Sequence, residues 1–410
     1  MSDIQFIALL IFVFFVFSAA LIYVNLNVIN PYGGGGEFYL PWSGGRAFLF
    51  DHIEPYSSAI PANVQELVYG RAVQAGEEPY ILDIPFHILL LYFPFSLLSD
   101  PQLARAIFTL LPELALFLLA YLSLRLTDWK SPIIFSILFY VFCLFNFYSL
   151  QALLEATPVL VLGFIYAGIL LALREGLDEL AGALVAIACY RWDVGGPFLL
   201  LVLLRVLHER RKRVLAGFGM LTFILLIVSF LIYPDWFIPF LRATSNNLRA
   251  DFGLSIQSVL SNLWPVFGTR LAWGLRILLL ISLGFEWIIA RRSDFRRFYW
   301  AACLGLAAAP LLGFRTEMEN LAILILPLAL VFAITYERWR RIGRILIFVI
   351  LIFAFAVPWG IYFIAIPRFG EIAEEMLFLF YPVFTVIGVY WIRWWAIRPP
   401  RTWSDRARLN

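Results

Sequence analysis

Long uninterrupted apolar runs constrain this chain more than any other feature. Only 14% of its residues are charged, whereas a soluble domain carries about a quarter. The sequence therefore predicts an all-α, polytopic transmembrane fold with lipid around much of its surface. Ten runs are long enough to cross a hydrocarbon core of roughly 30 Å, and they fall at about 5–27, 103–124, 132–149, 156–173, 214–233, 273–290, 298–313, 321–336, 344–366 and 377–395.

Two further apolar stretches are shorter than a bilayer span. One covers 86–98, and the other is the pair 180–190 and 196–207, interrupted by Arg191-Trp192-Asp193. Charge and helix-breaking residues at membrane depth are tolerated where protein or a water-filled cavity receives them. We therefore expect 180–207 to be a hairpin of half-helices whose tip points into a polar site. The whole chain, 1–410, is predicted to form a single transmembrane domain of about 10–12 membrane segments.

The basic residues are distributed unevenly among the loops. With the N-terminus in the cytoplasm, the internal loops and the tail hold 21 of the 31 Lys and Arg residues, and the external segments hold seven. Because cytoplasmic loops are enriched in Lys and Arg, this asymmetry predicts a multi-pass cell-membrane protein with both termini in the cytoplasm. The first apolar run lacks a cleavage site and is interpreted as a retained helix. The net charge of +3 gives no indication of a nucleic-acid partner.

Three external segments gather polar residues. The first, 28–85, contains Gly33 to Gly36 followed by Glu37, and 61–75 within it is a candidate surface helix. The second external loop is 234–272, and the third segment is the link 313–320. The three cysteines lie inside apolar runs and the three histidines are scattered, so neither a disulfide framework nor a metal cluster is expected.

Several short motifs together resemble a known family. The first loop reads GGGGEFYLPWSGGRAFLFDHIEPYS, with an acidic residue just after the first helix and Pro55-Tyr56 eighteen positions later. FPFSLLSDPQLARAIFTLL, GLDELAGALVAIACYRWD and FRTEMENLAILILPL continue the match. This layout resembles the polytopic glycosyltransferases of the GT-C superfamily, and glycosyltransferase family 87 most closely. The resemblance spans most of the chain, although each motif is short.

The resemblance implies an activity and a set of site residues. Such enzymes move a hexose such as mannose from a polyprenyl-phosphate donor to a lipid or glycan acceptor on the external face. A carboxylate deprotonates the acceptor hydroxyl, and Glu37 occupies the family's acidic position. Cationic groups hold the phosphate. The candidates for donor-phosphate and substrate binding are Arg191, Arg315, Arg249, Glu155, Asp193, Asp51, Tyr56 and Asn320.

The sequence departs from the family pattern at three points. Glu37 is one methylene longer than the usual Asp. The hairpin tip has Arg191-Trp192-Asp193 where Lys-Pro is common, and Glu155 stands where relatives carry small polar residues. Glu155 is either a second acid or a partner of Arg191. No cofactor is required by these motifs, and a divalent ion held by Glu37, Glu155 and phosphate is left open.

Alternative interpretations accompany each residue and the function itself. Glu37 and Asp51 have a simpler interpretation as solvated loop residues, and Arg191 with Asp193 as a structural ion pair. Arg315 is either a phosphate partner or an interfacial residue; if it is a partner, it should meet Arg191 in one charged cavity. For the whole protein, the alternatives are a transporter or flippase of lipid-linked sugars and a catalytically inactive structural relative.

Overall fold

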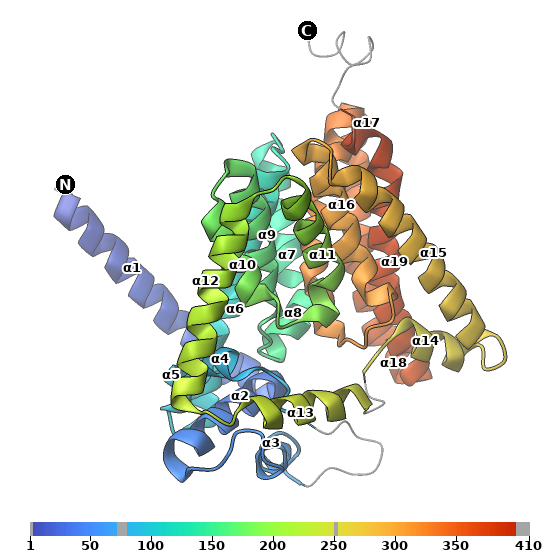
Figure 1. Cartoon of the computed structure of the whole chain (residues 1–410). Coiled ribbons are helices and arrows are strands. Elements are labelled where there is room, and N and C mark those ends of the chain that lie inside the picture. The colour runs from blue at the N-terminus through green and yellow to red at the C-terminus, as the bar shows by residue number, and fades with distance from the viewer. Residues whose placement is uncertain (1–2, 72–79, 250–252, 399–410) are drawn as a thin grey trace. The chain divides into compact units, whose positions relative to one another are not determined.

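A computed structural model describes residues 3–71, 80–249 and 253–398 (Figure 1). Within these ranges the regular structure is helical, apart from an isolated antiparallel bridge between Leu254 and Thr316. Seven described helices are long and apolar enough to span a membrane, or eight when the bent pair α7 (Ile133–Phe145) and α8 (Phe147–Leu154) counts as one. The prediction of an all-α, polytopic membrane protein is confirmed.

The spans correspond to the apolar runs of the sequence. Two predicted runs, 156–173 and 298–313, form the shorter helices α9 (Val159–Glu175) and α16 (Phe295–Ala308). The run 132–149 is divided between α7 and α8, which are bent by 46°. The seven long spans are Ile11–Tyr32, Pro101–Leu126 (α6), Lys212–Ile232 (α12), Gly268–Ala290 (α15), Met318–Trp339, Arg341–Phe369 and Glu371–Ala396 (α19).

The helix α17 (Ile325–Gly360) turns back on itself. A Cβ added to Gly343 would lie 2.6 Å from the carbonyl oxygen of Thr335, whereas eight residues of straight helix rise about 12 Å. The guanidinium of Arg344 also lies 5.9 Å from the centroid of the Tyr336 ring, within the limit of about 6 Å for a cation–π contact. The two spans predicted at 321–336 and 344–366 are therefore confirmed as separate legs.

The chain divides into two compact units. Unit 1 comprises Met1–Ala115, Gln151–Val161 and Leu225–Asp251. Its core is an aromatic cluster around Phe108 of α6, whose ring centroid lies 4.8 Å from that of Phe38 and 5.2 Å from that of Tyr92. Phe38 belongs to α2 (Gly36–Arg46), and this cluster fixes α2 against α6. The helix α1 (Asp3–Val24) exposes most of its apolar side chains, as expected for a lipid-facing span.

The remaining helical segments of unit 1 are short. The apolar stretch predicted at 86–98 is helical over Phe86–Ser96. The candidate surface helix forms as α3 (Ala59–Tyr69), whereas 72–75 lie outside the described residues. The other segments are η1 (Asn25–Ile29), η2 (Asn30–Tyr32), η3 (Ala47–Asp51), α4 (Phe86–Leu89), η4 (Leu90–Tyr92), α5 (Phe93–Ser96) and α13 (Phe237–Arg249).

Unit 2 comprises Leu116–Leu150, Leu162–Ile224 and Phe252–Asn410. Its centre is α16, in which every residue from Phe298 to Ala308 is buried. The small side chains of α16 allow close packing, and its Gly305 faces the backbone of Pro197 and Phe198. It contacts α11 (Trp192–His208), α15, α17 and α19 (Figure 1). The remaining segments are α10 (Asp178–Ala188), α14 (Ile256–Leu263), η5 (Ala309–Leu311), η6 (Met318–Leu324), η7 (Ile361–Ala365) and α18 (Ile366–Phe369).

The predicted half-helix hairpin is present in unit 2. Its two arms are α10 and α11, separated by residues 189–191. Asp178 at the start of α10 forms an ion pair of 2.6 Å with Arg211, three residues after the end of α11. Because the two feet meet, the arms run antiparallel and the hairpin begins and ends at the same end of the unit. Arg191 therefore lies at its tip.

Candidate functional site

The turn that links the first span to α2 is built from four consecutive glycines. Gly33, Gly34 and Gly35 have φ values of +80°, +71° and +87°, a region that side chains with a Cβ disfavour. A Cβ on Gly34 would lie 2.6 Å from Oε1 of Glu155, and one on Gly35 would lie 2.7 Å from Nε of Arg105. Both conformation and space therefore require glycine at Gly34 and Gly35, because the turn closes directly over these two side chains.

Arg105 is buried beneath the turn, with 1% of its surface exposed. Its guanidinium donates to the carbonyl oxygen of Gly33 at 2.8 Å and to that of Leu154, and it lies 5.7 Å from the ring of Tyr39. It forms no ion pair with the part of the chain that the structure describes. Two backbone carbonyls thus take the place of the carboxylate that usually accompanies a buried cation.

Glu155 fixes the other side of the turn. Its Oε2 accepts a hydrogen bond of 3.0 Å from the backbone N–H of Gly35. Gly35 is the residue before α2, so this carboxylate satisfies one of the N–H groups that a helix leaves free at its start. The following residue of the chain, Ala156, adopts a left-handed φ of +49°. Glu155 and Arg105 together therefore attach the glycine turn to the rest of unit 1.

Glu37 lies directly after this turn, in the first turn of α2. Its side chain is half-buried, whereas the next eight residues of the helix are buried. The N-terminal end of a helix carries a partial positive charge that stabilises an ionised carboxylate. The glycine turn, Arg105 and Glu155 thus determine where a carboxylate suited to act as a base is held.

Tyr56 lies in the same unit, in the turn after η3. Its hydroxyl donates to the carbonyl oxygen of Ile84 at 3.0 Å. Burial raises the pKa of Tyr56 far above its ordinary range, and Tyr233 and Asp83 add to the effect. The phenol therefore stays protonated and acts as a donor. Asp51 and Arg249 are exposed, at the ends of η3 and α13.

Arg191 and Asp193 lie in unit 2 and bind each other. Arg191 Nε and NH2 donate to the two carboxylate oxygens of Asp193 at 3.0 and 2.9 Å. The side chains are 17% and 27% exposed. Arg191 precedes α11 and Asp193 lies in its first turn. The structural ion pair that the sequence left open is therefore formed, at the tip of the hairpin.

Arg315 and Asn320 also lie in unit 2, on the link between η5 and α17. Arg315 is exposed beside the bridge between Leu254 and Thr316. Asn320 is 3% exposed and donates to the Thr316 hydroxyl at 3.1 Å, whereas its carbonyl oxygen is buried without a hydrogen-bond partner. Since α11 packs on η5, the tip of the hairpin and this link share one end of unit 2.

The structure thus divides the predicted site residues between the two units. Unit 1 contains Glu37, Asp51, Tyr56, Glu155 and Arg249, and unit 2 contains Arg191, Asp193, Arg315 and Asn320. Within unit 1, Glu37 and Glu155 share the glycine turn. Within unit 2, Arg191 pairs with Asp193, while its predicted meeting with Arg315 stays a prediction. Among the described residues, no three His, Cys, Asp or Glu side chains are grouped so that they could hold a metal ion.

Arg105 is the residue that the sequence analysis missed. It lies within the quoted stretch FPFSLLSDPQLARAIFTLL, but it was assigned no role. Two signals point to it. It is a cation at the start of an apolar span, where charge is rarely kept without a use, and four consecutive glycines indicate a backbone that closes over something bulky.

Comparison with known proteins defines the family. The apolar spans establish that the chain is a multi-pass membrane protein. The profile of glycosyltransferase family 87 matches residues 85–312, more than half of the chain, which therefore belongs to this family and is a membrane glycosyltransferase. The matched region includes Arg105, Glu155 and the hairpin, whereas Glu37 precedes it and Arg315 follows it. No curated protein matches the chain.

Proposed function

We propose that this glycosyltransferase moves a hexose, mannose in the first instance, from polyprenyl phosphate to a lipid or glycan acceptor. Glu37 is the proposed catalytic base. The observation that carries the proposal is the position of Glu37 at the start of α2, beside a glycine turn fixed by Arg105 and Glu155. Deprotonation of a hydroxyl requires a base that is held in a fixed position, and a carboxylate next to this turn meets that requirement.

The proposed reaction needs one base and a stabilised leaving group. The acceptor oxygen attacks the anomeric carbon of the sugar, while its proton passes to Glu37. The bond between the anomeric carbon and the phosphate oxygen breaks, and polyprenyl phosphate leaves with the electron pair. Because negative charge develops on the phosphate, arginine side chains are suited to stabilise it. Arg191, Arg315 and Arg249 are the proposed partners, with Asp51, Tyr56 and Asn320 near the sugar or acceptor.

Replacement of Glu37 by Gln tests the base. The amide keeps the shape of the side chain but cannot accept the proton, so transfer from mannosyl phosphopolyprenol should fall by about 10²–10⁴. Transfer is measured with the purified protein in lipid nanodiscs and a radiolabelled donor. Glu66→Gln is the matched control, because Glu66 is an exposed carboxylate on α3 in the same loop. This variant should keep the activity of the unmodified protein.

The same assay distinguishes the alternatives. Near-normal transfer by Glu37→Gln would remove Glu37 as the base. Movement of the intact donor between leaflets without sugar transfer would instead support a flippase. A protein that transfers no sugar from mannosyl, glucosyl or galactosyl phosphopolyprenol would be an inactive relative. Chelation by EDTA tests the divalent ion that the sequence left open.

We also propose that the first loop faces the cell exterior and that both termini are cytoplasmic. The support is the asymmetry of loop charge, 21 basic residues against seven. Single cysteines at Ser57 and Asn246, in a chain whose own three cysteines are replaced, should react with an impermeant maleimide in intact cells. A cysteine at Ser404 should react only after permeabilisation. Labelling of Ser404→Cys in intact cells would reverse the orientation.

A further inference from the structure

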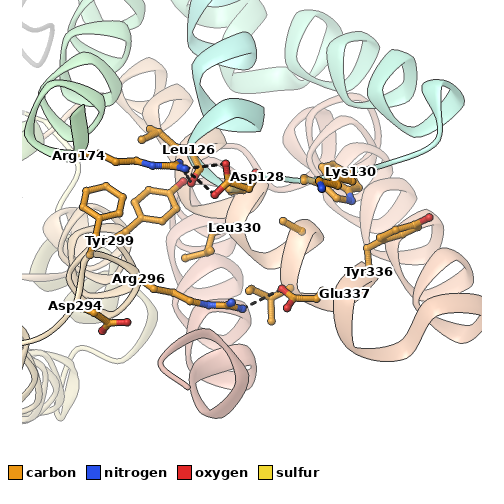
Figure 2. A pocket seen from close by; sticks show the side chains of 15 residues that line it. Leu126, Asp128, Lys130, Arg174, Asp294, Arg296, Tyr299, Leu330, Tyr336 and Glu337 are labelled. Atoms are coloured by element: carbon orange, nitrogen blue, oxygen red, sulfur yellow. Dashed lines mark hydrogen bonds and ion pairs between the residues drawn. The ribbon is translucent and has the colours of Figure 1, made fainter. Parts of the chain in front are cut away.

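A cavity of about 720 Å³ opens at one end of unit 2 (Figure 2). Four parts of the chain form it: the loop 127–130 after α6, the end of α9, the start of α16 and the end of the first leg of α17. From this cavity α16 extends for 14 residues, about 20 Å, before η5 leads to Arg315. The cavity is therefore at the opposite end of unit 2 from Arg315, and it is distinct from the candidate site.

The wall of the cavity combines apolar side chains with two ion pairs. Leu126, Leu330, Ala333 and Ile334 supply the apolar part. At the rim, Arg174 donates to both carboxylate oxygens of Asp128 at 2.9 Å, and Arg296 donates to Glu337 at 3.0 Å (Figure 2). Within each pair, the positive charge of the arginine is neutralised by the carboxylate. The remaining acid, Asp294, interacts electrostatically with Arg205, which itself forms an ion pair of 2.8 Å with Glu209.

Besides the two ion pairs, the cavity is lined by hydrogen-bond donors. Lys130 is exposed and forms no ion pair with any described residue. The indole N–H of Trp129 is buried without a hydrogen-bond partner. Buried polar groups normally have partners. The ammonium of Lys130 and the indole N–H of Trp129 can therefore both donate to an acceptor in the cavity, and phosphate offers several oxygens.

We propose that this cavity binds the phosphate of an anionic phospholipid headgroup, with Lys130 as its cation. The apolar wall favours a lipid over a free anion, because it can accommodate the first methylene groups of a chain. Lys130, Arg174 and Arg296 belong to the loops whose charge predicts the cytoplasmic face. A cavity between membrane helices on that face is suited to a lipid headgroup where it offers a cation outside any ion pair, and Lys130 is that cation here. The lipid therefore comes from the leaflet opposite to that of the proposed sugar donor.

The chain offers a matched control, since Lys130 and Lys212 are its two lysines. Lys212 is exposed at the start of α12 and does not line the cavity. Binding of phosphatidylglycerol to the purified protein is measured by native mass spectrometry, with phosphatidylcholine as the neutral comparison. Lys130→Gln should weaken phosphatidylglycerol binding about tenfold, the effect expected from losing one charge-assisted contact. Lys212→Gln should leave it unchanged, and Lys130→Arg should restore most of it.

Inorganic phosphate and glycerol 3-phosphate are tested as competitors. Weak competition by both, with binding lost in Lys130→Gln, supports a lipid site. Competition as effective as that of the lipid would show a site for free anions and overturn the lipid assignment. Equal binding by Lys130→Gln and Lys212→Gln would overturn the cavity as a phosphate site. Trp129→Phe removes the buried indole N–H without removing charge and provides a second variant if Lys130→Gln does not fold. It should also weaken phosphatidylglycerol binding, and unchanged binding would overturn the cavity as a phosphate site.

Discussion

The glycine turn of unit 1 and the hairpin tip of unit 2 stabilise an arginine in different ways. Arg105 is 1% exposed, and its partners are backbone carbonyls 49 and 72 positions away in the sequence. Arg191 is more exposed and binds Asp193, two positions away. The first arrangement exists only when the fold is complete, whereas the second can form within one turn of chain. Loss of Arg105 should therefore affect the whole unit, and loss of Arg191 should have a local effect.

The largest effect is expected for Arg105→Met. Removing the guanidinium leaves two carbonyls without their charged donor, which should lower the free energy of unfolding by about 3 kcal/mol. Because a displacement of about 1 Å in an active site can cost 10²-fold, transfer should also fall by about that factor. Denaturant titration in mixed micelles and the nanodisc assay measure the two effects.

Arg46→Met is the matched control for this change. Arg46 also donates to two carbonyls, those of Ser96 and Leu98, but at 3.3 and 3.4 Å and from a half-buried side chain. A loss of about 1 kcal/mol or less is expected. Equal losses for the two variants would contradict the contrast between them.

Gly35→Ala should have an intermediate effect, and Gly70→Ala separates its causes. Gly35 and Gly70 are both in the left-handed helical region, so both variants should lose about 1–2 kcal/mol of stability. An added Cβ at Gly70 meets nothing within 4 Å, whereas one at Gly35 overlaps Arg105. Gly35→Ala should therefore lose a further 1 kcal/mol, roughly the lower end of the cost of overpacking, because the overlapping atoms belong to a long side chain that can shift. Indistinguishable unfolding midpoints would show that the turn does not close tightly over Arg105.

The smallest effect is expected at the hairpin tip. A double-mutant cycle with Arg191→Gln and Asp193→Asn should give a coupling energy of about 0.5–1 kcal/mol, because the pair is partly exposed and screened by solvent. Thermal unfolding of the four proteins provides the measurement. A coupling energy above about 3 kcal/mol, the range of buried pairs, would place the pair among the principal contacts of unit 2 and remove the contrast with Arg105.

The membrane spans were predictable because their signal is local. Each apolar run contains its own evidence, and so does the hairpin, whose break at Arg191-Trp192-Asp193 is visible in the sequence. The ion pair of Arg191 and Asp193, two positions apart, was one of two interpretations that the sequence left open, beside a role in binding phosphate. The bend of 46° between α7 and α8 was not, because the apolar run continues on both sides of Asn146.

The arrangement around the glycine turn could not be derived from the sequence. Glu155 was expected to be a second acid or a partner of Arg191, but its observed hydrogen bond is with Gly35, 120 positions away. The contact depends on the packing of α2 against α6, which no local pattern specifies. The cavity at Lys130 could not be derived from the sequence either, because its wall combines four segments between residues 126 and 337.

The reversal within α17 has a consequence for how the protein enters the membrane. Gly343 approaches Thr335 so closely that the two legs are joined by a few residues, without room for a loop. Two spans joined in this way lie antiparallel, so the orientation of one leg in the membrane fixes the orientation of the other. Because Lys and Arg bias a connection toward the cytoplasm, the arginines at this connection, Arg338, Arg341 and Arg344, act on both legs together. A change in their charge therefore acts on the pair, and not on either span alone.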